Sequence, residues 1–273
     1  MRPLLRAVAA GWPLLAAALH AQTAPPPADA LPTYTPFTLP SHALGEDRVV
    51  NVHLPEGYAA EGGRRFPVLY MPDGGLDEDF PHVVNTVDSL VALGRIRPVI
   101  VVGVPNTERR RDLTGPTRLA SDSAIAPRVG GSAAFRAFFG KELIPAIDGR
   151  YRTTGERAIV GESLAGLFIV ETLLREPALF THYVALDPSL WWNAGALVDS
   201  AASALARLPR GPRTLELSSS SVDEIATATA RLAALLDRVS GRRLRARYTP
   251  RPDLTHATIF RGEGPSALAR ALR

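Results

Sequence analysis

Short runs rich in β-branched residues alternate along the chain with longer stretches whose apolar residues recur at helical spacing. The short runs predict strands at 48–54, 66–71, 98–104, 157–160, 183–186, 214–217 and 244–248. The longer stretches predict helices at 83–93, 133–147, 164–174, 196–208, 222–239 and 265–272. Strands and helices in alternation are typical of an α/β fold in which helices cover both faces of a mostly parallel sheet.

The length of the chain suits one domain with a large core. It has 273 residues, of which 46% are hydrophobic. Residues 41–273 show no internal repeat and no second core boundary, and we expect them to form a single α/β domain. Residues 22–40 hold several prolines and little periodicity, which predicts an extended leader that enters the fold.

The first residues have the pattern of a secretory signal peptide. Arg2 and Arg6 precede an apolar run from 7 to 19, and a small-residue exit at Ala21 follows. A run of this length, interrupted by a proline, is too short to span a bilayer. We therefore expect residues 1–21 to be removed and the mature chain to be exported, periplasmic or secreted, without stable membrane insertion. A retained membrane anchor is the alternative.

Charge and composition argue against several classes of partner, metal site and cofactor. The chain has 31 lysines and arginines against 27 aspartates and glutamates, and they are interspersed, so no basic stripe predicts nucleic-acid binding. The lack of cysteine excludes disulfides, thiolate catalysis and cysteine-ligated metals. The acidic residues at 73–79 lack metal-ligand spacing, and glycine patterns for phosphates or dinucleotides are absent. We expect no cofactor and no metal, and the oligomeric state stays open.

A candidate nucleophile lies in the segment GESLAG at 161–166, between a predicted strand and an apolar helix. This is the context of a nucleophile elbow, a tight turn that lifts a serine hydroxyl to the edge of the sheet. The alternative is that Ser163 only caps the helix. A serine hydroxyl is a weak nucleophile near neutral pH, so the assignment requires a base.

His256 is the predicted base. It lies in the loop after the last predicted strand and follows Ser163, which fits the chain order serine, acid, histidine. The other five histidines lie in the signal peptide, inside or before a strand, or upstream of Ser163. The alternative is an ordinary histidine of a surface loop.

The carboxylate that orients the base has several candidates. Asp223 follows the strand at 214–217, where such a carboxylate commonly lies, and it is our first choice, although it also suits the first turn of a helix. Its neighbour Glu224 has capping-box spacing from Ser221, which would occupy it. Asp187, directly after another strand, is the rival. A serine–histidine dyad without a carboxylate is a further alternative.

An oxyanion hole is expected near the nucleophile. The backbone N–H of Leu164 would form it together with the N–H of Gly75 or Gly74, after the strand that ends at Met71. The alternative for these glycines is an ordinary turn.

About 28 residues separate the strand that ends at Val104 from the next long helix, which predicts a lid or pocket wall. In it, Arg109 and Arg111 are expected to bind an anionic or catechol-bearing substrate, unless ion pairs with neighbouring acids only brace the loop. Trp191 and Trp192 follow a strand end and are expected to form an aromatic wall, unless they only fill core.

Taken together, these residues resemble the putative-esterase branch of the α/β-hydrolase superfamily, which contains enterobactin-esterase-like and related acyl esterases. The resemblance covers residue 48 to the C-terminus and rests on the segments 66–74, 106–114, 142–145, 161–166, 187–192 and 255–256. It implies an α/β-hydrolase fold, with Ser163 as nucleophile and His256 as base.

The chain departs from the family pattern at several positions. Glu162 stands where the family usually has His, and Ala165 where it usually has Gly, which makes the elbow more crowded and the field at Ser163 more negative. Asp187 stands where Ser is usual, and the stretch 218–221 lacks the Gly-rich acidic turn often found there. The assignment of the carboxylate is the part most affected.

The sequence therefore predicts an exported serine esterase that hydrolyses small-molecule carboxylic esters through an acyl-enzyme on Ser163, with His256 as base. A siderophore or feruloyl-type esterase is the alternative within the same class. Acyl transfer to a sugar or lipid is another. A catalytically silent binding protein that keeps the hydrolase scaffold is the alternative of a different class.

Overall fold

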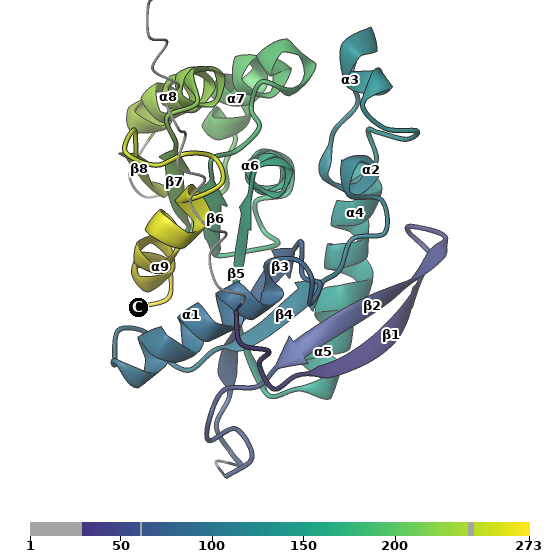
Figure 1. Ribbon diagram of the computed structural model, residues 1–273, viewed down its shortest axis with the longest axis vertical. Coiled ribbons are helices and arrows are strands. Elements are labelled where there is room, and N and C mark those ends of the chain that lie inside the picture. Colours follow the sequence, from purple (N-terminus) through teal and green to yellow (C-terminus); the bar gives the residue numbers. More distant parts are fainter. Residues whose placement is uncertain (1–28, 61, 240–242) are drawn as a thin grey trace, which may run out of the picture.

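The computed structural model describes residues 29–60, 62–239 and 243–273. Eight strands of these residues form one sheet in the order β1-β2-β4-β3-β5-β6-β7-β8 (Figure 1). Neighbouring strands from β4 to β8 run parallel, whereas β2 runs antiparallel to both β1 and β4. The predicted α/β-hydrolase fold with its mostly parallel sheet is thus confirmed. The strands are β1 (Thr35–Ser41), β2 (Glu46–His53), β3 (Phe66–Pro72), β4 (Ile100–Val104), β5 (Thr153–Glu162), β6 (His182–Leu186), β7 (Thr214–Ser219) and β8 (Arg245–Pro250).

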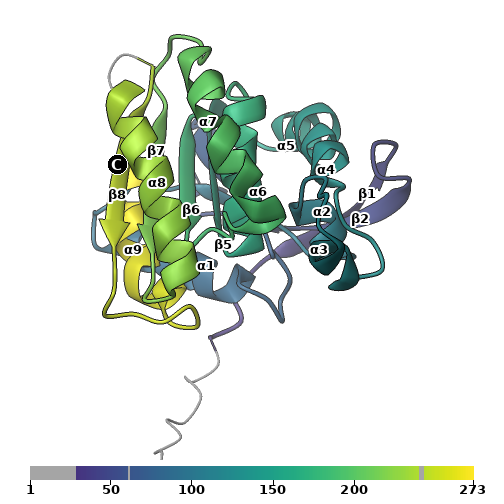
Figure 2. The same ribbon diagram turned by 90° about the horizontal axis from the view of Figure 1, so that it is seen from above.

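Helices cover both faces of the sheet (Figure 2). The helices α1 and α9 pack on one face, and α4 to α8 pack on the other. The short helices α2 and α3 lie in the long insertion after β4. The helices are α1 (Phe80–Ala92), α2 (Arg109–Leu113), α3 (Ala120–Ala124), α4 (Ser132–Phe138), α5 (Ile144–Arg150), α6 (Leu164–Arg175), α7 (Ala196–Ala206), α8 (Asp223–Val239) and α9 (Ile259–Ala271), with a π-helical turn η1 (Phe139–Leu143) and a 3-10 turn η2 (Trp192–Gly195).

The central strands are apolar on both faces because both faces are covered. Along β3, Val68 and Tyr70 belong to the core under α4 to α8, and Leu69 and Met71 belong to the core under α1 and α9. Buried parallel strands read as continuous apolar runs for this reason, without polar alternation. The pattern in the sequence therefore located these strands well.

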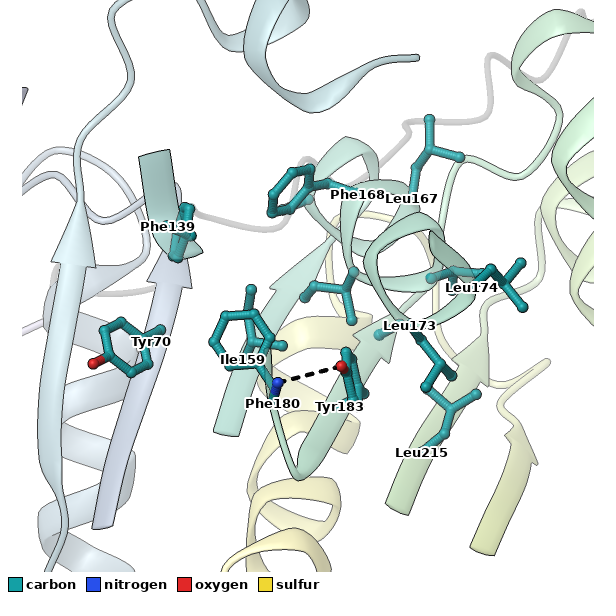
Figure 3. Close-up of a cluster of buried hydrophobic side chains, with 14 of the residues drawn as sticks. Tyr70, Phe139, Ile159, Leu167, Phe168, Leu173, Leu174, Phe180, Tyr183 and Leu215 are labelled. Atoms are coloured by element: carbon teal, nitrogen blue, oxygen red, sulfur yellow. Dashed lines mark hydrogen bonds between the residues drawn. The ribbon is translucent and has the colours of Figure 1, made fainter. Parts of the chain in front are cut away.

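Aromatic rings fill the core beneath α6 (Figure 3). Tyr70, Phe139, Phe180 and Tyr183 meet edge to face, with ring centroids 5.8 to 6.3 Å apart. The backbone N–H of Phe180 donates to the Tyr183 hydroxyl over 3.3 Å. This packing fixes α6, the helix that follows Ser163, against the sheet.

Three elements differ from the sequence prediction. Residues 35–40, the end of the expected leader, belong to the edge strand β1, because their backbone pairs with β2 despite two prolines. The predicted helix 133–147 contains the π-helical turn η1. The helix α9 begins at Ile259, not at Pro265, since Ile259 and Phe260 are buried.

The predicted signal peptide and residues 22–28 of the predicted leader lie outside the described residues, and the prediction of export stays a prediction. Within the described ranges, no helix is both long enough and apolar enough to cross a bilayer.

Arg48 connects β2 to the insertion after β4. Its side chain is 0% exposed and donates to Asp112, also 0% exposed, over 2.7 Å, and to the carbonyl of Pro105 over 2.8 Å. Its guanidinium lies 5.1 Å from the ring centroid of Phe135. A buried ion pair of this kind fixes the base of the insertion, because either charge would be costly to leave without its partner.

We expect Arg48→Met to lower the free energy of unfolding by about 3 kcal/mol, because it leaves the Asp112 carboxylate buried with fewer partners. Urea denaturation measures this change. The control is Arg97→Met, which breaks the exposed pair between Arg97 and Glu156 and should cost less than about 1 kcal/mol. Equal losses in the two variants would contradict the structural role of Arg48.

Candidate active site

The turn between β5 and α6 holds Ser163 in a strained backbone conformation. Its φ of 60° and ψ of −120° are unusual for a residue other than glycine. Small neighbours permit this turn: a Cβ on Gly161 would lie 2.6 Å from the Cβ of Ala165, and one on Gly166 would lie 3.0 Å from the Cα of Pro188. The local geometry is that of a nucleophile elbow.

Ser163, His256 and Asp187 form a hydrogen-bonded series. The Oγ of Ser163 lies 3.2 Å from Nε2 of His256, and Nδ1 of His256 lies 2.6 Å from Oδ2 of Asp187. The Ser163 hydroxyl also lies 3.3 Å from that of Ser189. The structure thus brings together the predicted nucleophile and base, with a carboxylate on the far side of the imidazole. Such a series can transfer a proton from the serine to the histidine.

The carboxylate in this series is Asp187, not Asp223, and this corrects our first choice. Asp187 directly follows β6 and is fully buried, and its Oδ1 accepts a hydrogen bond of 2.6 Å from the Ser220 N–H. Asp223 and Glu224 are exposed at the start of α8, with no hydrogen bond to His256 among the described residues. The end of β7 instead contributes the backbone donor that holds Asp187.

The loop that carries His256 is fastened to the end of β7. Arg251 N–H donates to the Ser219 carbonyl over 2.7 Å, and Ser221 N–H donates to the Leu254 carbonyl over 2.8 Å. These bonds direct the loop back along the edge of the sheet. His256 therefore reaches Asp187 after β6 and Ser163 after β5, two and three strands away from β8. The hydrogen bond to Asp187 raises the pKa of His256, and the charge of Glu162 acts in the same direction, against the effect of burial.

The predicted oxyanion donors differ in whether their N–H groups already donate a hydrogen bond. Among the described residues, no acceptor binds the N–H of Leu164, the first residue of α6. The N–H of Gly75, however, donates to Oε2 of Glu78 over 2.7 Å, and the Gly74 N–H donates to the Val104 carbonyl over 3.0 Å. Gly75 is therefore not a free donor here, which corrects its prediction as an oxyanion group.

Sequence reasoning missed Glu78 and Asn106. The side-chain nitrogen Nδ2 of Asn106 donates to Oε1 of Glu78 over 2.6 Å and to Oδ1 of Asp73 over 2.5 Å. Together they fix the loop after β3. Their positions after two adjacent strands were the available signal, because the carboxyl ends of parallel strands meet at one edge.

The predicted arginines serve different purposes. The Arg111 side chain is only 12% exposed and pairs with Glu46 over 2.7 Å and with Asp112 over 2.6 Å. This matches the alternative of a braced loop and corrects the prediction that Arg111 binds substrate. Arg109 is more exposed and binds both carboxylate oxygens of Asp73, over 2.7 and 2.8 Å.

The insertion also forms an open pocket of about 620 Å³. Three of its four arginines pair with acidic side chains, whereas Arg110 is exposed and donates to the Ile125 carbonyl. The pocket therefore presents Arg110 most freely to a ligand. Its lining is Glu108, Arg109, Arg110, Arg111, Ala126, Pro127 and Arg128.

The two tryptophans after β6 differ in burial and in contacts. Trp192 is buried, and its indole N–H donates to the Gly115 carbonyl over 2.8 Å, which joins the insertion to η2. It lines a cavity of about 110 Å³ with Leu167 and Leu197. Trp191 is half-buried against the same core, 6.2 Å from Trp192 between ring centroids. Trp192 thus fills core and borders a cavity as well.

One set of acidic and histidine side chains has metal-like spacing within the described ranges. The ligand atoms of Glu162, Asp187 and His256 lie within 4.8 Å of one another. Both ring nitrogens of His256 already face hydrogen-bond partners, Ser163 and Asp187. This arrangement suits proton transfer better than metal binding, because a metal would displace one of these bonds.

Known proteins with similar sequences are esterases, as the geometry of the site suggests. The chain is 28% identical over 187 residues to the ferri-bacillibactin esterase BesA of Bacillus subtilis, which covers 59% of this chain and 63% of that protein. It is 29% identical over 189 residues to a siderophore triacetylfusarinine C esterase of Aspergillus fumigatus, with 61% and 62% covered. The matches therefore span less than two thirds of these relatives' lengths.

A solved structure agrees as well. An IroE-like serine hydrolase from Shewanella oneidensis superposes with a TM-score of 0.78 at 27% identity, over 88% of this chain and 79% of that one. The family model described as putative esterase matches residues 41–237, and the chain belongs to the putative esterase family.

Proposed function

We propose that the protein hydrolyses an ester bond of a siderophore through an acyl-enzyme on Ser163. The observation that carries this proposal is the series Ser163–His256–Asp187, placed at the elbow of a putative-esterase chain. The names of the relatives, a ferri-bacillibactin esterase and a triacetylfusarinine C esterase, favour a siderophore over the general ester that we first predicted.

Each group of the series has one task in the proposed reaction. Nε2 of His256 takes the proton of Ser163 as the serine oxygen bonds to the ester carbonyl carbon, and Asp187 stabilises the imidazolium. The Leu164 N–H holds the negative oxygen. The proton then passes from His256 to the leaving alcohol, and a water molecule, activated in the same way, releases the acid and restores the serine.

The arginine-lined pocket supports a substrate with anionic groups. Arg110 borders it with the exposed part of Arg109 and with Arg128, which also pairs with Glu108. Guanidinium groups bind the paired oxygens of carboxylates and similar chelating anions. A metal-chelating siderophore presents oxygen ligands of this kind, so the pocket suits it better than a small neutral ester.

Residues 1–21 support a further proposal, that the chain is exported and cleaved after Ala21. Amino-terminal sequencing of protein recovered outside the cytoplasm tests it, because a chain that still begins at Met1 would contradict it.

We expect the wild-type protein to hydrolyse enterobactin, and Ser163→Ala and His256→Ala each to lower kcat by about 10³-fold or more, because they remove interdependent members of one unit. Chromatography of the released acids measures the rate. Glu224→Gln is the control and should keep wild-type turnover.

A simple aryl ester separates the remaining alternatives. If it is hydrolysed with a much higher kcat/KM than enterobactin, the enzyme is a general esterase. Arg110→Gln should raise KM for enterobactin several-fold and leave the aryl ester unaffected. A chain that hydrolyses neither substrate and does not react with a fluorophosphonate would be a silent binding scaffold.

The role of Asp187 is open to a direct measurement. Asp187→Asn should lower the pKa of His256, because it removes the carboxylate that favours the imidazolium. Proton NMR of the His256 ring across pH reports this value without any substrate. Asp223→Asn should leave it unchanged, and a fall in that variant instead would restore our first choice.

A further inference from the structure

Glu162 is a carboxyl group beside the nucleophile that the proposed mechanism does not use. It ends β5, and β5 pairs with β6 so that Glu162 lies opposite Leu186. Asp187 follows Leu186 directly. The two carboxyl groups therefore approach His256 from adjacent strands, with Oε1 of Glu162 lying 3.8 Å from Nδ1 of His256.

The surroundings of Glu162 leave its inner oxygen without a partner. Oε1 is buried, and no described residue donates a hydrogen bond to it. The side chain is 17% exposed. Arg109, whose charge acts on Glu162, is bound through two bonds to Asp73 and does not pair with Glu162. A carboxylate in this position lacks most of the solvation that favours its charge.

Burial and neighbouring charges both shift the pKa of Glu162. Burial raises the pKa of Glu162 to about 8, and the charge of His256 opposes this rise. The carboxylates of Asp79, at the start of α1, and Asp187, after β6, add to the rise, while Arg109 in α2 opposes it. Two groups whose pKa values are both raised thus lie within 4 Å of each other.

We propose that Glu162 is a positioning residue whose charge sets the pH at which His256 becomes the free base. The role rests on the proposed esterase function. When ionised, Glu162 stabilises the imidazolium from the Nδ1 side, and when protonated, it leaves His256 as the neutral base. It does not relay the catalytic proton, which moves from Ser163 to Nε2 and then to the leaving alcohol.

The two groups titrate as a coupled pair. One proton shared between Glu162 and His256 has two arrangements, with the proton on the carboxyl or on the imidazole, and only the first leaves a base for Ser163. The charged groups that act on His256 are Asp187, Glu162 and Arg109. Removal of the Glu162 charge alone should therefore make His256 a weaker base that titrates independently.

The test compares the wild type with Glu162→Gln, which keeps the size of the side chain and removes its charge. We expect the acid limb of the kcat/KM profile to move to lower pH by about one unit in the variant. The His256 ring signals in NMR should show two inflections in the wild type, one of them near pH 8, and a single inflection in the variant. A role in packing alone would change neither the limb nor the inflections.

Glu224→Gln serves as the matched control, since this glutamate is exposed and is not among the charged groups that act on His256, and it should keep both wild-type profiles. Unchanged profiles in Glu162→Gln would overturn the proposal even if ester hydrolysis is normal. The NMR titration needs no substrate, so it tests Glu162 even if no ester is hydrolysed. The wild-type titration also needs no variant, and a single inflection there would overturn the proposal if Glu162→Gln fails to fold.

Discussion

The register between β5 and β6 is the constraint on which the site depends. Parallel pairing puts Glu162 opposite Leu186, and the Ser163 N–H then donates to the Leu186 carbonyl over 3.1 Å. The nucleophile and Asp187 therefore leave adjacent strands at the same level. A shift by one residue would turn alternate side chains to the other face of the sheet and separate the two groups. The apolar core under α6 stabilises this register because both strands are buried in it.

The sequence predicts the sheet and the elbow well because both leave local signals. Continuous apolar runs mark the buried strands, and glycines around Ser163 mark a turn where two backbones approach. The edge strand β1 leaves a weaker signal, since it holds prolines and is largely exposed. The start of α9 was placed too late because Pro265 is normally tolerated best in the first turn of a helix.

The carboxylate could not be assigned from sequence, for a geometric reason. Asp187 and Asp223 both follow strands that end at the same sheet edge, so topology alone admits either one. The choice depends on how far the loop after β8 returns across the sheet, and backbone bonds of Arg251 and Ser221 to residues some 30 positions away decide this. The same limit applies to Arg111, whose main partner, Glu46, is 65 residues away in the chain. Long-range pairing of this kind leaves no local pattern.

The acidic character of the site follows from opposing demands on the same charges. A carboxylate near His256 stabilises the imidazolium, but one near the carbonyl carbon opposes the negative oxygen that forms there. Asp187 can stabilise the imidazolium because the imidazole lies between it and Ser163. Glu162 is next to Ser163 in the chain, and a permanent charge on it would destabilise the negative oxygen. Burial raises the pKa of Glu162 to about 8 and so favours its protonated form, in which a second carboxyl group can lie beside the nucleophile without opposing the negative oxygen.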